Sequence, residues 1–557
     1  MCRCRRCPNR FSDPNVIDIW VVPGKGVRYR NHFVRPSECD RPLNHLDNIR
    51  DCLNRGRADE AKGLALAFTR ANPSNADGCF QLARAYAQLA CYGQALASAE
   101  RGLALAPRHP TGMLVSIEAK LGLGRIAEAL TDARQVERER SNDPSAIVQI
   151  GYCYTRTNRH KDAARCFERV RVLEPANYAV LHNLAGSCVA LGEPERAGRL
   201  YEELLRKEPR AYETYYTRAT LGRQTPERNH VAELERVLAG VPRGGIAEVA
   251  LCFALAKELE ELGEWKRSFA FLKRGADIHH KLAAYDIESD LKAMDGIKRY
   301  FDKNFLAAAA TGADSESPIF ILGMPRTGTT LIDRILCSHS QVGSVGECDE
   351  FFRALVRGAN GEGAKLDLKR ARPIAWDRVG AEYRRALAGI EPDRSRLVDK
   401  TLTNFLYIGP ILMALPGAKI IHVRRNAMDT CYAMYKTLFR QAFEYSYNLT
   451  GLGRYYLGYK AMMEHWAEVL PGRFLTVDYE ELVGSQEEVS RRLVAFCGLE
   501  WEDACLSFEK NASPSFTASA AQVRESIYTS SVQLWRHYES ELAPLRRVLE
   551  EGGCDIA

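Results

Sequence analysis

A strict period of 34 residues in the first half of the chain constrains its fold more than any other feature. Five alanines keep this period: Ala61, Ala95, Ala129, Ala163 and Ala197. Four positions after each of them stand Ala65, Ala99, Ala133, Phe167 and Tyr201, and twelve positions after stand Pro73, Pro107, Ser141, Pro175 and Pro209. A small side chain lets two helices cross closely, and proline ends a helix because it has no N–H to donate. The period therefore predicts stacked pairs of antiparallel helices.

This pattern resembles tetratricopeptide (TPR) repeats, with five units over residues 42–211. The resemblance implies a TPR solenoid over 42–245, and then a degenerate TPR-like helix pair with a connector helix over 246–305. Residues 1–41 are expected to be a poorly ordered leader. Two roles stay open for the solenoid: a concave surface that binds a protein or peptide, or a brace that dimerises or supports the neighbouring domain.

Length and composition limit the class of protein. A chain of 557 residues exceeds one hydrophobic core, so we expect two or more domains. The net charge of +6 is mild and is no signature of nucleic-acid binding. The sequence contains no run of about 20 apolar residues, so we expect no membrane span. The N-terminus lacks the apolar core of a signal peptide. Scattered cysteines at apolar helical positions, such as Cys188 and Cys252, indicate a reducing cytoplasm.

The arginine-rich N-terminus holds Cys2, Cys4 and Cys7 close together. A zinc site needs a fourth ligand and a folded frame around it, and the neighbouring sequence offers neither. Metal binding and a disordered or non-native leader are the two interpretations, and we expect no metal.

The second half opens with an anion-binding arrangement. Residues 318–323 form a short apolar run that is typical of a buried parallel strand. A glycine loop, Met324 to Thr330, follows, and a helical pattern continues from it. This layout directs backbone N–H groups and the positive end of a helix at an anion. A nucleotide P-loop requires lysine where Thr329 stands, and the cation here is Arg326, which argues against a kinase or ATPase.

The loop sequence Pro-Arg-Thr-Gly-Thr-Thr resembles the 5′-phosphosulfate loop of sulfotransferases that use 3′-phosphoadenosine 5′-phosphosulfate (PAPS), nearest to the tyrosylprotein type. The resemblance covers about residues 318–540. It implies an α/β domain over 306–557, with a parallel sheet, helices on both faces and the ligand at the carboxyl ends of the strands. The residues implied to hold the 5′-phosphosulfate are Arg326, Thr327, Gly328, Thr329 and Thr330.

Two more segments match the nucleotide-binding parts of that family. Arg425 follows a second apolar run, 419–424, and the resemblance makes it a bidentate ligand of the 3′-phosphate, with Arg424 as a candidate neighbour. The family places a serine eight residues on, where this chain has Ala433. Residues 522–528 resemble the late segment that folds over the nucleotide, which makes Arg524 and Ser526 candidate phosphate ligands.

Glu347 is the candidate general base, because the family carries its base in a Gly-Glu pair and an acceptor hydroxyl must lose its proton. The alternative is that Glu347 caps a helix from Cys348 onward. Glu350 is a second candidate base, and we expect His339 to pack or hydrogen-bond at a helix end.

Lys400 lies in a segment that resembles the Asp-Lys segment of the family. That resemblance gives it the task of neutralising charge on the leaving oxygen, and a surface lysine at a strand end is the alternative.

These residues predict a PAPS-dependent sulfotransferase that acts on an acceptor hydroxyl of protein tyrosine, carbohydrate or a small phenol. The reaction needs no metal in principle, because arginine and lysine supply the positive charge. The alternative is a TPR protein-binding scaffold whose nucleotide-binding domain is weakened or inactive, with Ala433 as the visible sign.

Overall fold

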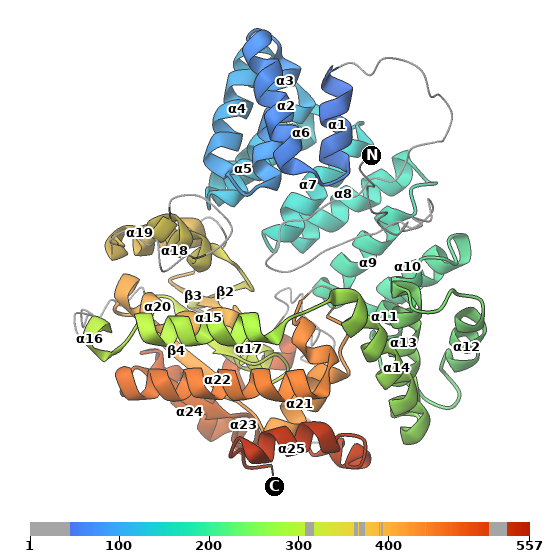
Figure 1. Cartoon of the computed structure of the whole chain (residues 1–557), viewed down its shortest axis with the longest axis vertical. Coiled ribbons are helices and arrows are strands. Elements are labelled where there is room, and N and C mark those ends of the chain that lie inside the picture. Colours follow the sequence, from blue (N-terminus) through green and yellow to red (C-terminus); the bar gives the residue numbers. More distant parts are fainter. Residues whose placement is uncertain are drawn as a thin grey trace, which may run out of the picture.

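A computed structural model describes residues 45–306, 317–360, 366, 374–388, 390, 394–439, 442–511 and 532–556. A helical solenoid forms the first half and a parallel sheet with helices on both faces forms the second (Figure 1). The predicted fold class, α followed by α/β, is confirmed.

Paired helices build the solenoid, and the second helix of each of the first five pairs carries one of the five periodic alanines. All five alanines are fully buried. The helices are α1 His45–Asn54, α2 Ala58–Ala71, α3 Ala76–Gln88, α4 Tyr92–Leu105, α5 Pro110–Gly122, α6 Ile126–Glu139, α7 Pro144–Arg156, α8 His160–Leu173, α9 Ala179–Leu191, α10 Pro194–Lys207, α11 Tyr212–Ala219 and α12 Val231–Ala239.

The next four helices pack on the second half, and the first two of them continue the solenoid. They are α13 Ile246–Glu261, α14 Trp265–Ala283, α15 Ile287–Tyr300 and α16 Lys303–Leu306. Residues 249–256 of α13 are all buried, so this helix lies inside the protein and has no wide polar face. Helix α14 packs against two short 3-10 helices of the second half, η2 (Glu444–Tyr447) and η6 (Leu534–Tyr538). Helix α15 lies along α22 (Leu449–Val469) (Figure 1).

The sheet has five parallel strands in the order β2-β3-β1-β4-β5. Their bounds are β1 Ile319–Gly323, β2 Val342–Gly346, β3 Arg396–Asp399, β4 Lys419–Arg424 and β5 Phe474–Asp478. The other elements of this half are α17 Thr329–Cys337, α18 Glu350–Asn360, α19 Trp376–Ala388, η1 Leu402–Tyr407, α20 Ile408–Ala414, α21 Ala427–Tyr435, η2 Glu444–Tyr447, α23 Tyr479–Gly484, α24 Gln486–Phe496, η3 Asp503–Leu506, η4 Phe508–Lys510, η6 Leu534–Tyr538 and α25 Ala543–Glu551.

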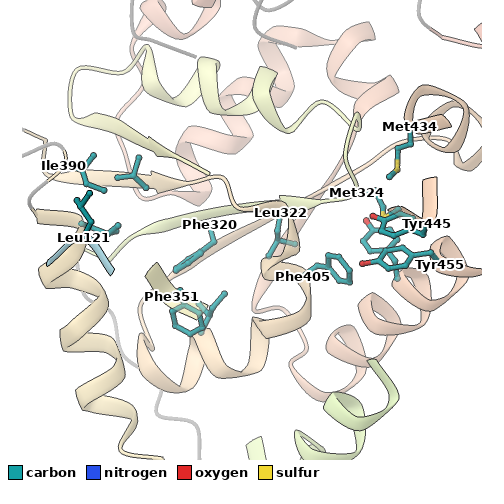
Figure 2. Close-up of a cluster of buried hydrophobic side chains, with 14 of the residues drawn as sticks. Leu121, Phe320, Leu322, Met324, Phe351, Ile390, Phe405, Met434, Tyr445 and Tyr455 are labelled. Carbon is teal, nitrogen blue, oxygen red and sulfur yellow. The ribbon is translucent and has the colours of Figure 1, made fainter. Parts of the chain in front are cut away.

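Alternate residues of β1 enter two different cores. Ile319 and Ile321 pack in a core with α17 and α24 on one face of the sheet. Phe320 and Leu322 pack on the other face, in a larger core that continues into the solenoid. Figure 2 shows part of that larger core, with Leu121 of α5 beside Ile390 at one end and Tyr445 and Tyr455 at the other.

The two halves therefore share one hydrophobic core. Its buried members run from Ile117 in α5 to Leu549 in α25. Within the described part of the chain, no helix is both long and apolar enough to cross a membrane.

Candidate active site

The predicted site residues follow the carboxyl ends of the parallel strands. Glu347 comes after β2, Lys400 after β3, the 324–328 loop after β1 and Arg425 after β4. Because neighbouring parallel strands lie about 4.8 Å apart, the sheet order brings these groups to one edge in that sequence.

The loop between β1 and α17 has the backbone geometry of an anion cradle. Arg326 and Gly328 both adopt left-handed φ values, of 69° and 99°, and Gly328 immediately precedes the first turn of α17. The N-terminal end of a helix carries a partial positive charge, so this first turn favours an anion in front of it. A side chain at Gly328 would approach the Tyr479 ring to 2.5 Å, so the glycine also keeps this corner open.

The three threonines of the Met324–Thr330 loop are buried, and they differ in their positions and contacts. Thr327, Thr329 and Thr330 are 2%, 4% and 6% exposed. The Thr327 hydroxyl donates a hydrogen bond of 2.8 Å to the carbonyl oxygen of Met324, which closes the loop. Thr327 is therefore suited to hold the loop shape, while Thr329 and Thr330 open the helix that faces the anion position.

Arg425 is built into the same loop. Its Nη1 atom donates a hydrogen bond of 3.2 Å to the carbonyl oxygen of Arg326, and its guanidinium lies 4.8 Å from the centre of the Tyr479 ring. Nη2 is 3.8 Å from Oδ1 of Asp429, one helical turn further on. Burial raises the pKa of the Asp429 carboxyl, and the Gln533 N–H that donates to it and the Arg425 charge both oppose that rise. These contacts fix a buried cation against the anion loop.

Glu347 and Lys400 form an ion pair. Lys400 Nζ donates to Glu347 Oε1 at 2.8 Å, and the lysine side chain is 2% exposed while that of the glutamate is 25% exposed. Helix α18 begins at Glu350, and the Glu347 side chain is directed to the lysine. The arrangement supplies a reachable carboxylate beside a buried ammonium.

Comparison with protein-family models identifies this half of the chain. Residues 318–503 match the model of the sulfotransferase family, and residues 180–211 match a tetratricopeptide repeat model. Residues 318–503 are a sulfotransferase-family domain.

Two relatives extend the comparison. A protein of uncharacterised function from Aquifex aeolicus (strain VF5) is 30% identical over 459 residues, which are 79% of this chain and 59% of that protein. The present chain therefore spans about three-fifths of that relative's length. A Caenorhabditis briggsae protein named "Putative protein-tyrosine sulfotransferase" is 26% identical over 239 residues, which are 40% of this chain and 81% of that protein.

Solved structures similar to this chain include TPR proteins. One is a thermophilic TPR protein of Thermus thermophilus, with 22% identity, a TM-score of 0.29, and coverage of 32% of this chain and 97% of that one. Another is a tetratricopeptide repeat protein of Parabacteroides merdae, with 17% identity, a TM-score of 0.31, and coverage of 42% and 91%.

A buried network under the Glu347–Lys400 pair of the sulfotransferase domain was not predicted from the sequence. Asp399 is fully buried and accepts hydrogen bonds from the Tyr383 hydroxyl at 2.8 Å and the Thr401 N–H at 2.9 Å. The Thr401 hydroxyl in turn bonds both the N–H and the carbonyl oxygen of Cys348. The Lys400 N–H also donates to the Gly346 carbonyl oxygen at 2.9 Å. The ends of β2 and β3 are thus tied together at the residues that precede and follow the pair.

The neighbouring candidates lie away from this pair. Arg424, the candidate neighbour of Arg425, points to the β5 side and forms a bidentate pair with Asp478, at 2.6 and 2.9 Å. Glu350 lies 3.8 Å from Arg353 and faces the turn at Gly124 of the solenoid. His339 follows the end of α17 and hydrogen-bonds the Glu500 carbonyl oxygen at 2.9 Å, which is one of the two roles expected for it.

Other candidates fall elsewhere. Arg524, Ser526 and the N-terminal cysteines Cys2, Cys4 and Cys7 lie outside the described residues. Over the described ranges, no group of three or more His, Cys, Asp or Glu side chains could hold a metal ion. Ala433 is buried within α21. It brings no hydroxyl to the position where the family has a serine.

Proposed function

We propose that the sulfotransferase domain transfers the sulfuryl group of PAPS to an acceptor hydroxyl, leaving 3′-phosphoadenosine 5′-phosphate (PAP). The observation that carries this proposal is the order of groups along the sheet edge. A carboxylate, a buried lysine, an anion loop and a buried arginine stand after β2, β3, β1 and β4, which are successive neighbours in the sheet. A donor with two separated anionic groups needs two cationic sites in line with an acceptor site.

The donor side of the site would consist of the loop and Arg425. The first-turn N–H groups of α17, the Arg326 guanidinium and the hydroxyls of Thr329 and Thr330 would hold the 5′-phosphosulfate. Arg425 would hold the 3′-phosphate, since the Arg326 carbonyl and the Tyr479 ring already orient it. The Lys that a nucleoside triphosphate would need after Gly328 is replaced by Thr329, which supports a sulfonucleotide over ATP.

The transfer itself needs a proton acceptor and a cation for the leaving group. As the acceptor oxygen bonds to sulfur, its proton would pass to the Glu347 carboxylate. The bond from sulfur to the bridging oxygen breaks, and the electron pair stays on the phosphate of PAP next to Lys400. Glu347 Oε1 and Lys400 Nζ lie 2.8 Å apart before the reaction. During transfer the carboxylate would take up the acceptor proton, and the ammonium would then be next to the negative charge of the leaving oxygen.

The solenoid would present the acceptor. Arg353 Nη2 lies 3.9 Å from Oδ2 of Asp349, two residues after Glu347, and the Arg353 guanidinium lies 6.0 Å from the centre of the Tyr92 ring of α4. A solenoid side chain therefore lies close to the segment that follows the Glu347 carboxylate. A protein or peptide held on the repeats would lie next to the base, and we propose this class of acceptor over a free small phenol.

The test uses the full chain with PAP, ATP and labelled PAPS. PAP should raise the midpoint of thermal unfolding. At a PAP concentration one hundred times its Kd, the free energy of unfolding should increase by about 2.7 kcal/mol. ATP should raise it far less. In Glu347→Gln the kcat of sulfuryl transfer should fall by roughly 10²- to 10⁴-fold while PAP affinity stays nearly the same, because a base acts on the acceptor.

The matched control is Glu481→Gln. Glu481 is a carboxylate of the same domain that pairs with Arg492 on the surface, and its loss should leave kcat unchanged. Equal midpoint shifts from ATP and PAP would contradict the sulfonucleotide assignment. PAP binding without transfer to any acceptor would favour the scaffold alternative.

A further inference from the structure

Helix α21 connects the proposed 3′-phosphate site to the solenoid side of the molecule. It has nine residues, so it is about 13 Å long, and all nine are buried. Arg425 stands just before its first turn. Asp429, Tyr432 and Lys436 follow at intervals of four, three and four residues, which places them along one face of the helix.

One carboxylate of helix α13 holds the far end of that face. Glu260 accepts a hydrogen bond from the Tyr432 hydroxyl and pairs with Lys436 Nζ at 2.5 Å. The Tyr538 hydroxyl of η6 also reaches it, at 3.2 Å. The Glu260 side chain is only 12% exposed, and charge-assisted bonds in such a setting are stronger than neutral ones.

Solenoid residues hold the chain beyond α21 as well. The Leu438 N–H donates to the hydroxyl of Tyr216 on α11 at 3.0 Å. Trp265 of α14 stacks on His537 with ring centres 3.9 Å apart, next to Tyr538. The first turn of α21 is therefore set by Arg425 and Asp429, and its last turn is set by helices of the other half.

We infer that Glu260 is a positioning residue for nucleotide binding: it holds α21 by Tyr432 and Lys436 and thereby sets the position of Arg425. This inference rests on the proposed function, because Arg425 matters to affinity only if the domain binds a 3′-phosphate. A short rigid helix transmits a shift at one end to the other, since its buried side chains leave no room for independent movement.

The experiment measures PAP affinity by calorimetry in the full chain, at a temperature where each variant is folded. Glu260→Gln keeps the size of the side chain but removes its charge from Lys436 and Tyr432. PAP should bind roughly 5- to 20-fold more weakly. Tyr432→Phe removes one hydroxyl and should weaken PAP binding by about 2- to 5-fold, and it serves as the test if Glu260→Gln fails to fold.

Glu261→Gln is the matched control. Glu261 is the next residue of the same helix and pairs with Lys257 at 2.8 Å and with the Gln224 N–H at 2.8 Å, both within the solenoid. It should lower stability by a similar mechanism and leave PAP affinity within twofold of the wild type.

The outcomes separate this inference from the proposed function. If the wild-type protein binds no PAP, the proposed function is wrong. If the wild type binds PAP and Glu260→Gln binds it within twofold, the positioning role is wrong. Equal weakening in Glu260→Gln and Glu261→Gln would also overturn that role, because it would indicate general loosening. Weakening in Glu260→Gln alone, rescued in part by Glu260→Asp, supports it.

Discussion

The outer repeats and the inner helices of the first half differ in how they relate to the sulfotransferase domain. Helices α1–α4 bury their apolar side chains in small clusters that extend no further than α5 and its turn, such as the one formed by Ile49, Leu53 and Leu82. Helices α13–α15 contribute Phe253, Phe269 and other side chains to the core that contains the sheet residue Phe320. In solenoids each unit contacts its neighbours only, so the outer units can change without disturbing distant ones.

This difference bears on the choice between a binding surface and a brace. We expect the last helices to act as a brace, because their apolar faces would be exposed without the sulfotransferase domain. The first units add no side chains to the shared core, and we propose that their surfaces bind a partner. The boundary lies near α5, where Ile117 is the first buried residue of the shared core.

Removing the whole first half should have the largest effect. A fragment of residues 306–557 lacks Phe253, Phe269, Met294 and Phe301, so the core side chains that pack against them would be exposed. Burial of a side chain of that size contributes about 1.5–3 kcal/mol, and several are lost together, against a total stability of about 5–15 kcal/mol. We expect the fragment to be insoluble or unfolded by circular dichroism.

The informative comparison is a fragment of residues 246–557, which keeps α13–α15. It should be better folded than the 306–557 fragment, because Phe253 and Phe269 stay in the core, but less stable than the full chain, because core residues such as Phe167 and Leu184 are lost. A well-folded 306–557 fragment with full PAP affinity would show that the inner helices are not a brace.

The sequence allowed the fold class and the neighbourhood of the site to be predicted, because both rest on local patterns. The alanine period specifies helix pairs, and an apolar run followed by the Gly328 loop specifies a strand, a turn and a helix. The resemblance to the sulfotransferase family assigned Glu347, Lys400 and Arg425 to one site, and their positions after apolar runs agree with it, because the carboxyl ends of parallel strands meet at one edge.

The side-chain partners that could not be predicted from the sequence come from contacts between distant segments. Glu260 and Lys436 are 176 positions apart, and neither lies in a motif. Arg424 was a candidate neighbour of Arg425, but the parallel register sets it opposite Asp478 of β5. Such partners are fixed by strand order and helix packing, which a single sequence does not encode locally.

A pair of matched core substitutions should show a smaller but still large effect. Phe80 and Phe253 are both fully buried, and either change to alanine should cost about 3–5 kcal/mol locally. Phe253 contacts the Tyr447 ring of the sulfotransferase domain, at 5.9 Å between centres, whereas Phe80 packs on His109 of the solenoid. Phe253→Ala should therefore weaken PAP binding, and Phe80→Ala should not.

Hydrogen exchange read by mass spectrometry checks where each variant opens. Phe80→Ala should increase exchange in α1–α5 alone. Faster exchange of the sheet strands in Phe80→Ala, to the extent seen in Phe253→Ala, would contradict the separation of the two regions.

Deleting residues 1–106 should have the smallest effect on the catalytic half and the most selective effect on function. The cut falls before α5, so the shared core from Ile117 onward is kept. A longer deletion, to residue 240, would remove core residues such as Phe167 and Leu184 and damage every property together. The shorter variant should keep PAP affinity within twofold and lose only a few degrees of melting temperature.

If the outer repeats present the acceptor, transfer to a polypeptide acceptor found with labelled PAPS should fall, while transfer to 4-nitrophenol stays unchanged. Parallel loss of both activities would mean that α1–α4 also support the catalytic half, and the recruiting role would then be withdrawn.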